Sequence, residues 1–481
     1  MSNRYITASI PYVNAKPHLG HLMEFIEADV LVRYYKLLGE EVRFVSGSDE
    51  HALKIVRKAQ EAGQDVEQYC AVHAQNFQDL AQQSLVMFDA FLRTSSADHR
   101  RSSQELWKRC EKAGDIYTKE YTGMYCVGCE QFYTTEELDS NGECYEHPGK
   151  PLEEVSEKNY FFKLSRYKQS LIDLIESNTL RVIPESKKNE ALGFLRGDVQ
   201  DFSISRSMTR ASGWGIPVPD DPDQVMYVWF DALNLYQTGV GFGTDQESYE
   251  KWWPADWHVI GKGISRFHTI YWPAILLSAG LKLPHTVAVH GYITVDGQKM
   301  SKTLGNVIDP GDLLVRYGAD GVRYLLTGHL STFEDSDISL KRFDELFVAH
   351  LSNGLGNLVS RVTAMASRLE LSRSSSVNSS SPFEAEFKQK INAFLIQDAV
   401  LWIWNKVDAL NKQMTEDRPW ELGAEDQAKL LITYLNEIEI IATHLQPFLP
   451  ESAAQILDSI TGKIEKVQPL FPRLDVPEGR S

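Results

Sequence analysis

The sequence has few cysteines, no long apolar run and no leader-like N-terminus. Five cysteines in 481 residues are few and odd in number, which argues against a secreted disulfide framework and leaves metal binding open. Cys70 and Cys110 fall in helix patterns and are expected to be buried thiols. The densest apolar stretch, Ile270–Leu277, is shorter than the roughly 18 residues of a membrane helix. Because Met1–Tyr5 leads directly into a strand pattern without a targeting segment, we expect a cytoplasmic protein with no membrane association.

Positive charge is also scarce. The formal net charge is −17, from 66 acidic residues against 49 lysines and arginines, which argues against non-specific nucleic-acid binding. A local basic surface is still allowed, because recognition depends on patches and not on the total charge. With 481 residues, 43% of them hydrophobic, the chain has the composition of a globular protein and the length for about two to four structural units.

Strand and helix patterns alternate along residues 1–114 and again along residues 204–342. Such alternation is typical of an α/β protein with a parallel sheet. Residues 115–203 carry short strands and turns instead, so we expect an insertion that interrupts one sheet. The segments predicted as strands of this sheet are Tyr5–Ile10, Glu41–His51, Val225–Asp231, Trp257–Lys262 and Thr286–His290.

Residues 343–481 largely lose the strand pattern and show helical spacing of apolar side chains, which predicts an all-α bundle. The serine-rich stretch Ser372–Ser381 is expected to be a loop between helices. The predicted helices are Leu346–Leu369, Phe383–Met414, Glu425–Leu445 and Glu451–Leu457.

Two histidines stand where the first strand pattern gives way to a helix. In Pro-His18-Leu-Gly20-His21 both imidazoles lie at a helix N-terminus, whose free N–H groups and positive dipole end attract phosphate. Gly20 lacks a side chain and leaves room for a flat group such as a purine. The alternative is that one histidine caps the helix while the other packs, and this motif alone favours that alternative.

Four residues in the insertion have the spacing of a zinc knuckle. Cys126-Val-Gly-Cys129 and Cys144-Tyr-Glu-His147 place two ligand pairs on turns at either side of a short hairpin-like segment. Three thiolates and one imidazole would complete a tetrahedral zinc site. Because such a site has no open position, we expect a structural ion.

A second loop places two lysines near each other. Asp296–Asn306 begins and ends with turn residues, and within it Lys299, Ser301 and Lys302 could surround a polyphosphate from separate directions. Alone, this segment is more often a solvated loop. Together with the histidine motif of a split α/β sheet, it favours a nucleotide site.

These motifs resemble those of class I aminoacyl-tRNA synthetases, and most closely the methionine-specific ones. His18-Leu-Gly-His21 is similar to the family's HIGH signature, and Lys299-Met-Ser-Lys302-Thr303 to its KMSKS loop. The resemblance runs almost end to end and includes Pro-Tyr-Val-Asn before the first motif. It implies a Rossmann-like catalytic domain in residues 1–114 and 204–342, a connective zinc insertion in 115–203, and an anticodon-binding bundle in 343–481.

The resemblance implies that the chain activates L-methionine with ATP and then transfers it to methionine tRNA. The methionine carboxylate would attack the α-phosphorus, with Mg²⁺ on the phosphates and pyrophosphate leaving. The implied catalytic residues are His18, His21, Lys299 and Lys302. The implied ATP-binding residues are His18, Gly20, His21, Lys262, Lys299, Ser301 and Lys302.

The resemblance also implies a methionine pocket. Asp49 would receive the substrate ammonium, and aromatic side chains would enclose the thioether. The implied methionine-binding residues are Ile10, Tyr12, Asp49, Trp229, Tyr236, Phe267 and His268. Gly263 stands where the family usually has Asp, which removes one expected contact on the ribose side. The short insertion leaves no room for a hydrolytic editing domain, which favours methionine over leucine, isoleucine or valine.

In the bundle, the resemblance assigns anticodon binding to Asn357, Arg361 and Trp420. An amide, a guanidinium and an indole can read unstacked bases, here those of a CAU anticodon. A packed helix surface is the alternative. The chain ends soon after Arg473, without the C-terminal RNA-binding domain of dimeric relatives, so we expect a monomer.

Two other functions remain open from the sequence. One is a class I synthetase for cysteine, in which zinc would contact the substrate thiol, although the four predicted ligands would complete a zinc site without it. The other is an RNA-binding paralogue without catalysis, which the intact histidine and lysine pairs argue against.

Overall fold

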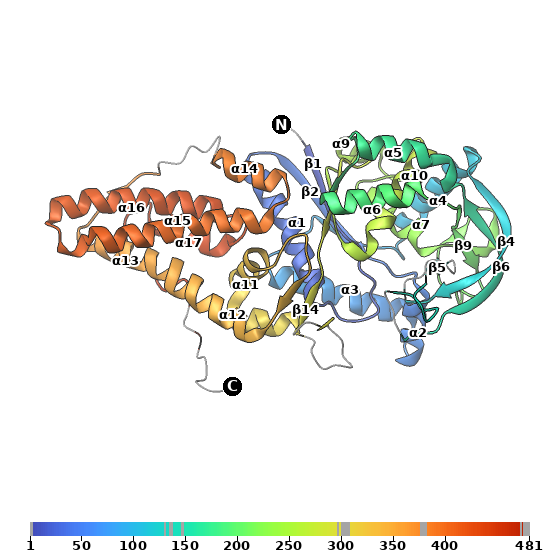
Figure 1. Ribbon diagram of the computed structural model, residues 1–481, viewed down its shortest axis with the longest axis horizontal. Helices are drawn as coiled ribbons and strands as arrows, with labels where there is room; N and C mark the ends of the chain where they lie inside the picture. The colour runs from blue at the N-terminus through green and yellow to red at the C-terminus, as the bar shows by residue number, and fades with distance from the viewer. Residues whose placement is uncertain are drawn as a thin grey trace.

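The structure is a computed structural model of the chain. Figure 1 shows an α/β part on one side and a bundle of long helices on the other, with helix α1 (Leu19–Leu37) near their junction. No helix in the described ranges is both long and apolar enough to cross a membrane. Those ranges are residues 3–128, 131–133, 138–145, 149–295, 298–299, 308–375, 382–471 and 474.

A parallel sheet forms the centre of the α/β part. Its strand order is β3-β2-β1-β12-β13-β7, so segments from the two alternating stretches of the sequence share one sheet. This confirms the predicted Rossmann-like core. The chain order changes direction between β1 and β12, and ligands of open α/β sheets bind at such a switch point. The strands are β1 (Asn3–Ala8), β2 (Glu41–Ser48), β3 (Ala90–Arg93), β7 (Arg181–Ile183), β12 (Trp257–Gly261) and β13 (Thr286–His290).

Two expectations about this sheet were wrong in detail. Val225–Asp231 is not one of its strands: β11 (Asp221–Met226) pairs antiparallel with other short strands, and the chain then enters α7 (Val228–Ala232). A short apolar run that is buried on all sides has no periodicity to separate strand from helix. Conversely, β7 pairs with β13 although it comes from residues 115–203, so that range is not wholly separate from the sheet.

Most of the remaining strands belong to small sheets. An antiparallel sheet in the order β5-β4-β6-β8 lies at the end of the molecule far from the bundle (Figure 1). A second has the order β10-β11-β9, and a third, β15-β14-β16, reaches the start of the lysine loop. Their strands are β4 (Ile116–Cys126), β5 (Gln131–Tyr133), β6 (Glu153–Phe162), β8 (Phe202–Ser203), β9 (Ser205–Ser207), β10 (Pro217–Val218), β14 (Ile293–Val295), β15 (Gln298–Lys299) and β16 (Ser336–Ile338).

Helix α1 is buried on more than one face, because it contacts β1, β2 and β12 as well as helices α3 and α11. Consequently its three acidic residues, which fall between apolar positions in the sequence, are all buried: Glu24, Glu27 and Asp29. The other helices up to residue 329 are α2 (Leu53–Glu61), α3 (Val66–Gln83), α4 (Ala97–Lys112), η2 (Leu164–Tyr167), α5 (Lys168–Glu176), α6 (Glu185–Arg196), α8 (Leu235–Thr238), α9 (Gln246–Trp252), η3 (Lys262–Ile264), η4 (Phe267–Tyr271), α10 (Trp272–Ser278) and α11 (Pro310–His329).

The C-terminal part is helical, as predicted, although two of its boundaries differ. The segment Phe383–Met414 forms two helices, because Phe394 adopts a left-handed backbone conformation (φ 57°) between them. A short strand pair, β17 (Ser372–Arg373) with β18 (Gly462–Lys463), occupies the start of the predicted serine-rich loop. The helices are α12 (Leu340–Leu346), the π-helix η5 (Phe347–Gly356), α13 (Asn357–Arg368), α14 (Ala385–Asn392), α15 (Ile396–Asp417), η6 (Pro419–Glu421), α16 (Ala424–Leu445) and α17 (Pro450–Ser459).

Candidate active site

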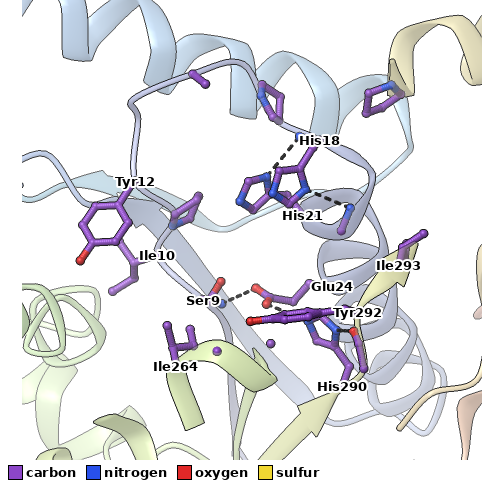
Figure 2. Close-up of a pocket in the computed structure, with 18 of the residues that line it drawn as sticks. Ser9, Ile10, Tyr12, His18, His21, Glu24, Ile264, His290, Tyr292 and Ile293 are labelled. Atoms are coloured by element: carbon purple, nitrogen blue, oxygen red, sulfur yellow. Dashed lines mark hydrogen bonds and ion pairs between the residues drawn. The ribbon is translucent and has the colours of Figure 1, made fainter. Parts of the chain in front are cut away.

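A cavity of about 680 Å³ opens beyond the carboxyl ends of β1, β12 and β13, beside the N-terminus of α1. Figure 2 shows His18 and His21 on one side, Ile10 and Tyr12 on another, and Glu24, Ile264, His290 and Tyr292 below them. The cavity therefore lies at the switch point of the sheet. Its lining residues are Ser9, Ile10, Pro11, Tyr12, Ala15, Lys16, Pro17, His18, Gly20, His21, Glu24, Trp229, Gly261, Gly263, Ile264, His290, Gly291, Tyr292, Ile293, Thr294, Asp309, Pro310 and Asp335.

The two histidines of the first motif cap α1 and line the cavity at the same time. His18 Nδ1 accepts a hydrogen bond from the Gly20 N–H (3.1 Å), and His21 Nδ1 accepts one from the His18 N–H (3.2 Å). The imidazole rings stack with centroids 3.7 Å apart. A Cβ on residue 20 would lie 3.1 Å from the His18 ring, so Gly20 makes room for this cap. Capping and ligand binding are thus not alternatives here.

The cap also determines which nitrogen can donate. Because Nδ1 accepts in both rings, the proton of each neutral imidazole resides on Nε2. Burial lowers the pKa of His21 well below its ordinary value, and the neighbouring His18 and His290 lower it further. His21 is therefore neutral at pH 7 and presents an Nε2–H donor. Such a donor can bind a phosphate oxygen without a change of protonation.

A buried ion pair forms the floor of the cavity. Glu24 Oε1 accepts from the Ser9 N–H (2.8 Å), and Glu24 Oε2 lies 3.0 Å from His290 Nε2. His290 Nδ1 lies 2.8 Å from the Gly291 carbonyl oxygen, so both ring nitrogens face acceptors. Burial alone would lower the pKa of His290, but the hydrogen bond and charge of Glu24 outweigh it and raise that pKa. This arrangement suits an imidazolium.

Aromatic side chains line the wall beside Ile10. Trp229 meets the Tyr12 ring edge to face at 5.9 Å and stacks on Phe267 with centroids 3.8 Å apart. Lys54 Nζ lies 3.3 Å from the centre of the Tyr12 ring. The structure therefore brings Ile10, Tyr12 and Trp229 to the cavity, with Phe267 behind them.

The other predicted methionine-binding residues lie behind this wall. Tyr236 and His268 are buried and joined by a hydrogen bond of 2.8 Å from the Tyr236 hydroxyl to His268 Nε2. Asp49 is also buried, and its backbone N–H donates to the Pro11 carbonyl (2.9 Å), which holds it beside the Tyr12 loop. Within the described chain, Asp49, Tyr236, Phe267 and His268 do not line the cavity as it stands.

The lysine loop is described only at its start. Thr294, in the strand before it, lines the cavity and pairs with Lys299 in the strand that follows. The Lys299 side chain lies outside the described part, as do Ser301 and Lys302. Lys262 contacts both carboxylate oxygens of Asp335, at 2.6 and 2.7 Å, and is not among the described residues that line the cavity.

Half of the predicted zinc site is described. Cys126 and Cys144 are buried, whereas Cys129 and His147 lie outside the described residues. The described part of the chain contains no cluster of three potential metal ligands. Because only two of the four predicted ligands belong to that part, the zinc site stays a prediction. The other predicted thiols, Cys70 and Cys110, are buried as expected.

The predicted anticodon residues gather at an exposed part of the bundle. The Arg361 guanidinium lies over the Trp420 ring at 5.2 Å, and 48% of Trp420 is exposed. Asn357 is exposed at the start of the same helix as Arg361. A large exposed indole beside an arginine is the type of surface on which unstacked bases can stack.

A sequence profile described as tRNA synthetases class I (M) matches residues 4–363. The methionine–tRNA ligase of Thermotoga maritima is 38% identical over 475 residues, which cover 95% of this chain and 75% of the relative. The chain belongs to the class I methionine–tRNA ligase family.

Two solved structures support this placement. The chain superimposes on Mycobacterium tuberculosis methionyl-tRNA synthetase in complex with methionyl-adenylate with a TM-score of 0.91, at 34% identity, covering 98% of this chain and 100% of the other. Against the free form of the same enzyme the TM-score is 0.83, at 32% identity, covering 99% of each chain. The described backbone is thus more similar to the adenylate-bound form than to the free form.

Sequence reasoning missed several cavity residues. It assigned no role to Glu24, His290, Tyr292 or Asp335, and it passed over Lys16. Two signals were available: three acids in an otherwise apolar helix pattern (Glu24, Glu27 and Asp29), and the segment His290–Val295 before the lysine loop, which is part of the resemblance. Nothing in the sequence indicates that Glu24 meets His290, 266 residues away.

Proposed function

We propose that the chain activates L-methionine with ATP to methionyl-adenylate and pyrophosphate, and then transfers the methionyl group to the 3′ end of methionine tRNA. The observation that supports this most strongly is that a histidine-capped helix N-terminus and an aromatic wall line the same cavity. One side suits phosphate and the other suits a thioether. Membership of the methionine–tRNA ligase family agrees with this combination.

In the proposed first step, the methionine carboxylate attacks the α-phosphorus of ATP in line, and the bond to pyrophosphate breaks. The Nε2–H groups of His18 and His21 donate to phosphate oxygens, whose negative charge grows in the transition state. The proposed roles of Lys299 and Lys302 are to bind the leaving pyrophosphate, with Gly20, Ser301 and Lys262 completing the ATP site. When bound, Mg²⁺ neutralises phosphate charge.

For the amino acid, we propose that Ile10, Tyr12 and Trp229 contact the methionine side chain. Phe267, Tyr236 and His268 support this wall from behind, and Asp49 binds the ammonium. Since shape alone separates similar aliphatic side chains by only about 1–3 kcal/mol per methylene, the soft contacts between sulfur and aromatic rings add useful selectivity.

The deciding experiment is amino-acid-dependent exchange of labelled pyrophosphate into ATP by the purified protein. We expect exchange with methionine and none with cysteine, leucine, isoleucine or valine. Exchange with cysteine would favour the cysteine enzyme. Binding of tRNA without any exchange would indicate a non-catalytic RNA-binding paralogue, and either result would overturn the proposal.

We also propose one structural zinc ion held by Cys126, Cys129, Cys144 and His147. Two buried thiols in one small antiparallel subdomain, which is too small for a large core of its own, support this donor set. Metal analysis of active protein is expected to find one zinc per chain, and its removal by a chelator is expected to unfold this subdomain. Active protein without zinc would rule the site out.

For the tRNA, we propose that Asn357, Arg361 and Trp420 read a CAU anticodon. The expected cytoplasmic location and monomeric state also remain proposals. Light scattering of the purified chain tests the latter, and a dimer mass would contradict it.

A further inference from the structure

The Tyr292 hydroxyl occupies the space next to Gly263 on the cavity floor. A Cβ on Gly263 would lie 2.2 Å from the Tyr292 hydroxyl oxygen, far inside van der Waals contact. Both residues line the cavity. An acidic side chain at position 263 would therefore require the Tyr292 ring to move.

A different carboxylate lies beside that space. Asp335 also lines the cavity, and its Oδ1 accepts from the Tyr292 N–H at 2.9 Å. Lys262 Nζ contacts both Asp335 oxygens and lies 4.4 Å from the centre of the Tyr292 ring. Two other backbone hydrogen bonds hold the segments together: Ser336 N–H donates to the Tyr292 carbonyl, and Gly291 N–H donates to Thr332. Asp335 is thus fixed from several directions.

The charge of Asp335 restricts what it can bind. Burial would raise its pKa, but the Lys262 hydrogen bond outweighs this effect and lowers it, so the carboxylate is ionised. An ionised carboxylate repels phosphate and accepts hydrogen bonds from hydroxyl groups. Its two oxygens offer about four acceptor positions, of which the contacts with Lys262 and the Tyr292 N–H occupy three, and 49% of the side chain is exposed.

Glu24, the other acid of the floor, is less suited to this task. Its oxygens already accept from Ser9 and face His290, and the residue is 4% exposed. In the adenylate, the hydroxyl-bearing part is the ribose, which joins the phosphate to the base. With phosphate at the histidines and methionine at the aromatic wall, the ribose is the part left for the acidic floor.

We propose that Asp335 binds a ribose hydroxyl of ATP and so supplies the acid that Gly263 does not. Tyr292 positions it, because its backbone N–H orients the carboxylate and its ring fills the space above Gly263. The inference rests on the proposed function, since it assigns one contact within that ATP site.

The test compares ATP, 2′-deoxy-ATP and 3′-deoxy-ATP as substrates for pyrophosphate exchange, with wild type and Asp335→Asn. With the wild-type protein, the analogue that lacks the hydroxyl bound by Asp335 is expected to have a KM about tenfold or more above that of ATP. Asp335→Asn is expected to raise the KM for ATP by a similar factor and to abolish the preference for ATP over that one analogue. Asp335→Glu, which keeps a carboxylate, should retain part of the preference.

Glu334→Gln is the matched control, because it removes a neighbouring exposed acid that does not line the cavity. It should behave as wild type with all three nucleotides. The inference is overturned if wild type uses both analogues as well as ATP, or if Asp335→Asn loses affinity equally for all three. In either case, continued methionine-dependent exchange by wild type leaves the proposed function intact, whereas no exchange at all overturns that function first.

Discussion

The two halves of helix α1 place buried acids in different surroundings. Near its N-terminus, Glu24 pairs with His290 at the cavity floor (3.0 Å). Further along, Asp29 contacts the fully buried Arg323 guanidinium (2.7 Å) and Arg33 (2.6 Å). Arg323, in α11, also donates to the carbonyls of Phe448, Pro447 and Ser84, which ties α1 through α11 to the turn between α16 and α17.

The difference separates a pair that borders the cavity from a pair that lies in the interior. Arg323 is fully buried, contacts four acceptors and does not border the cavity, so its role is to hold the two parts of the molecule together. The Glu24–His290 pair contains a titratable imidazole and borders open space. Glu27, between them in the sequence, has a buried Oε2 without a hydrogen-bond partner in the described chain, and burial raises its pKa to about 8.

Breaking the structural pair is expected to have the largest effect. Arg323→Met leaves Asp29 and three carbonyls without their buried donor, which typically costs about 3–5 kcal/mol of unfolding free energy. Urea unfolding followed by tryptophan fluorescence measures this. The control is Arg316→Met, because Arg316 makes a similar two-point pair with Asp344 at the surface and should cost about 1 kcal/mol or less. Equal losses in the two variants would contradict the comparison.

At the N-terminal end of α1, beside the cavity, a substitution is expected to lower the rate of methionine activation. His21→Ala removes a neutral Nε2–H donor, and loss of one such donor typically lowers kcat about 100- to 1,000-fold. Because His21 also caps α1, a stability loss of about 1 kcal/mol should accompany it. Pyrophosphate exchange and urea unfolding separate the two effects. His285→Ala, at a largely exposed histidine, is the control, and an unchanged kcat in His21→Ala would remove that residue from the mechanism.

Glu27 should respond to pH. Since its native pKa of about 8 exceeds the ordinary value of 4.5, the native state binds more protons than the unfolded state between these values, and stability falls as pH rises through this window. Glu27→Gln removes this slope. Relative to wild type, the stability of the variant should therefore increase by about 3–4 kcal/mol from pH 5 to pH 8. A constant difference in urea unfolding across that range would mean that Glu27 is ionised throughout.

The smallest expected effect lies at the far part of the bundle. Trp420→Ala removes the indole beneath Arg361, and should lower kcat/KM for tRNA charging about tenfold while methionine activation is unchanged. Leu401→Ala, another exposed apolar residue of the bundle, should change neither. Equal loss of both reactions in Trp420→Ala would show that Trp420 is chiefly structural.

Local patterns predicted much of this molecule because they depend on neighbouring residues. The turn from strand to helix at His18 and His21 and the helical nature of residues 343–481 are of this kind. The Glu24–His290 pair is not, since the two residues are far apart in sequence and an acid between apolar positions normally indicates a solvent-facing helix surface. Val225–Asp231 was misjudged because its short apolar run fits a buried helix turn as well as a strand.

The methionine-binding role that the resemblance implies for the aromatic residues stays a prediction. Trp229 contacts both Tyr12 and Phe267, yet only Tyr12 and Trp229 line the open space. Exposure depends on packing that no motif specifies.

The most direct test of the whole account is a single-turnover reaction with ATP labelled at the α-phosphate. We predict that methionyl-AMP accumulates with methionine and with no other amino acid, and that addition of a CAU-anticodon tRNA discharges it to methionyl-tRNA. Failure to form an aminoacyl-adenylate, or formation of one from another amino acid, would contradict the account.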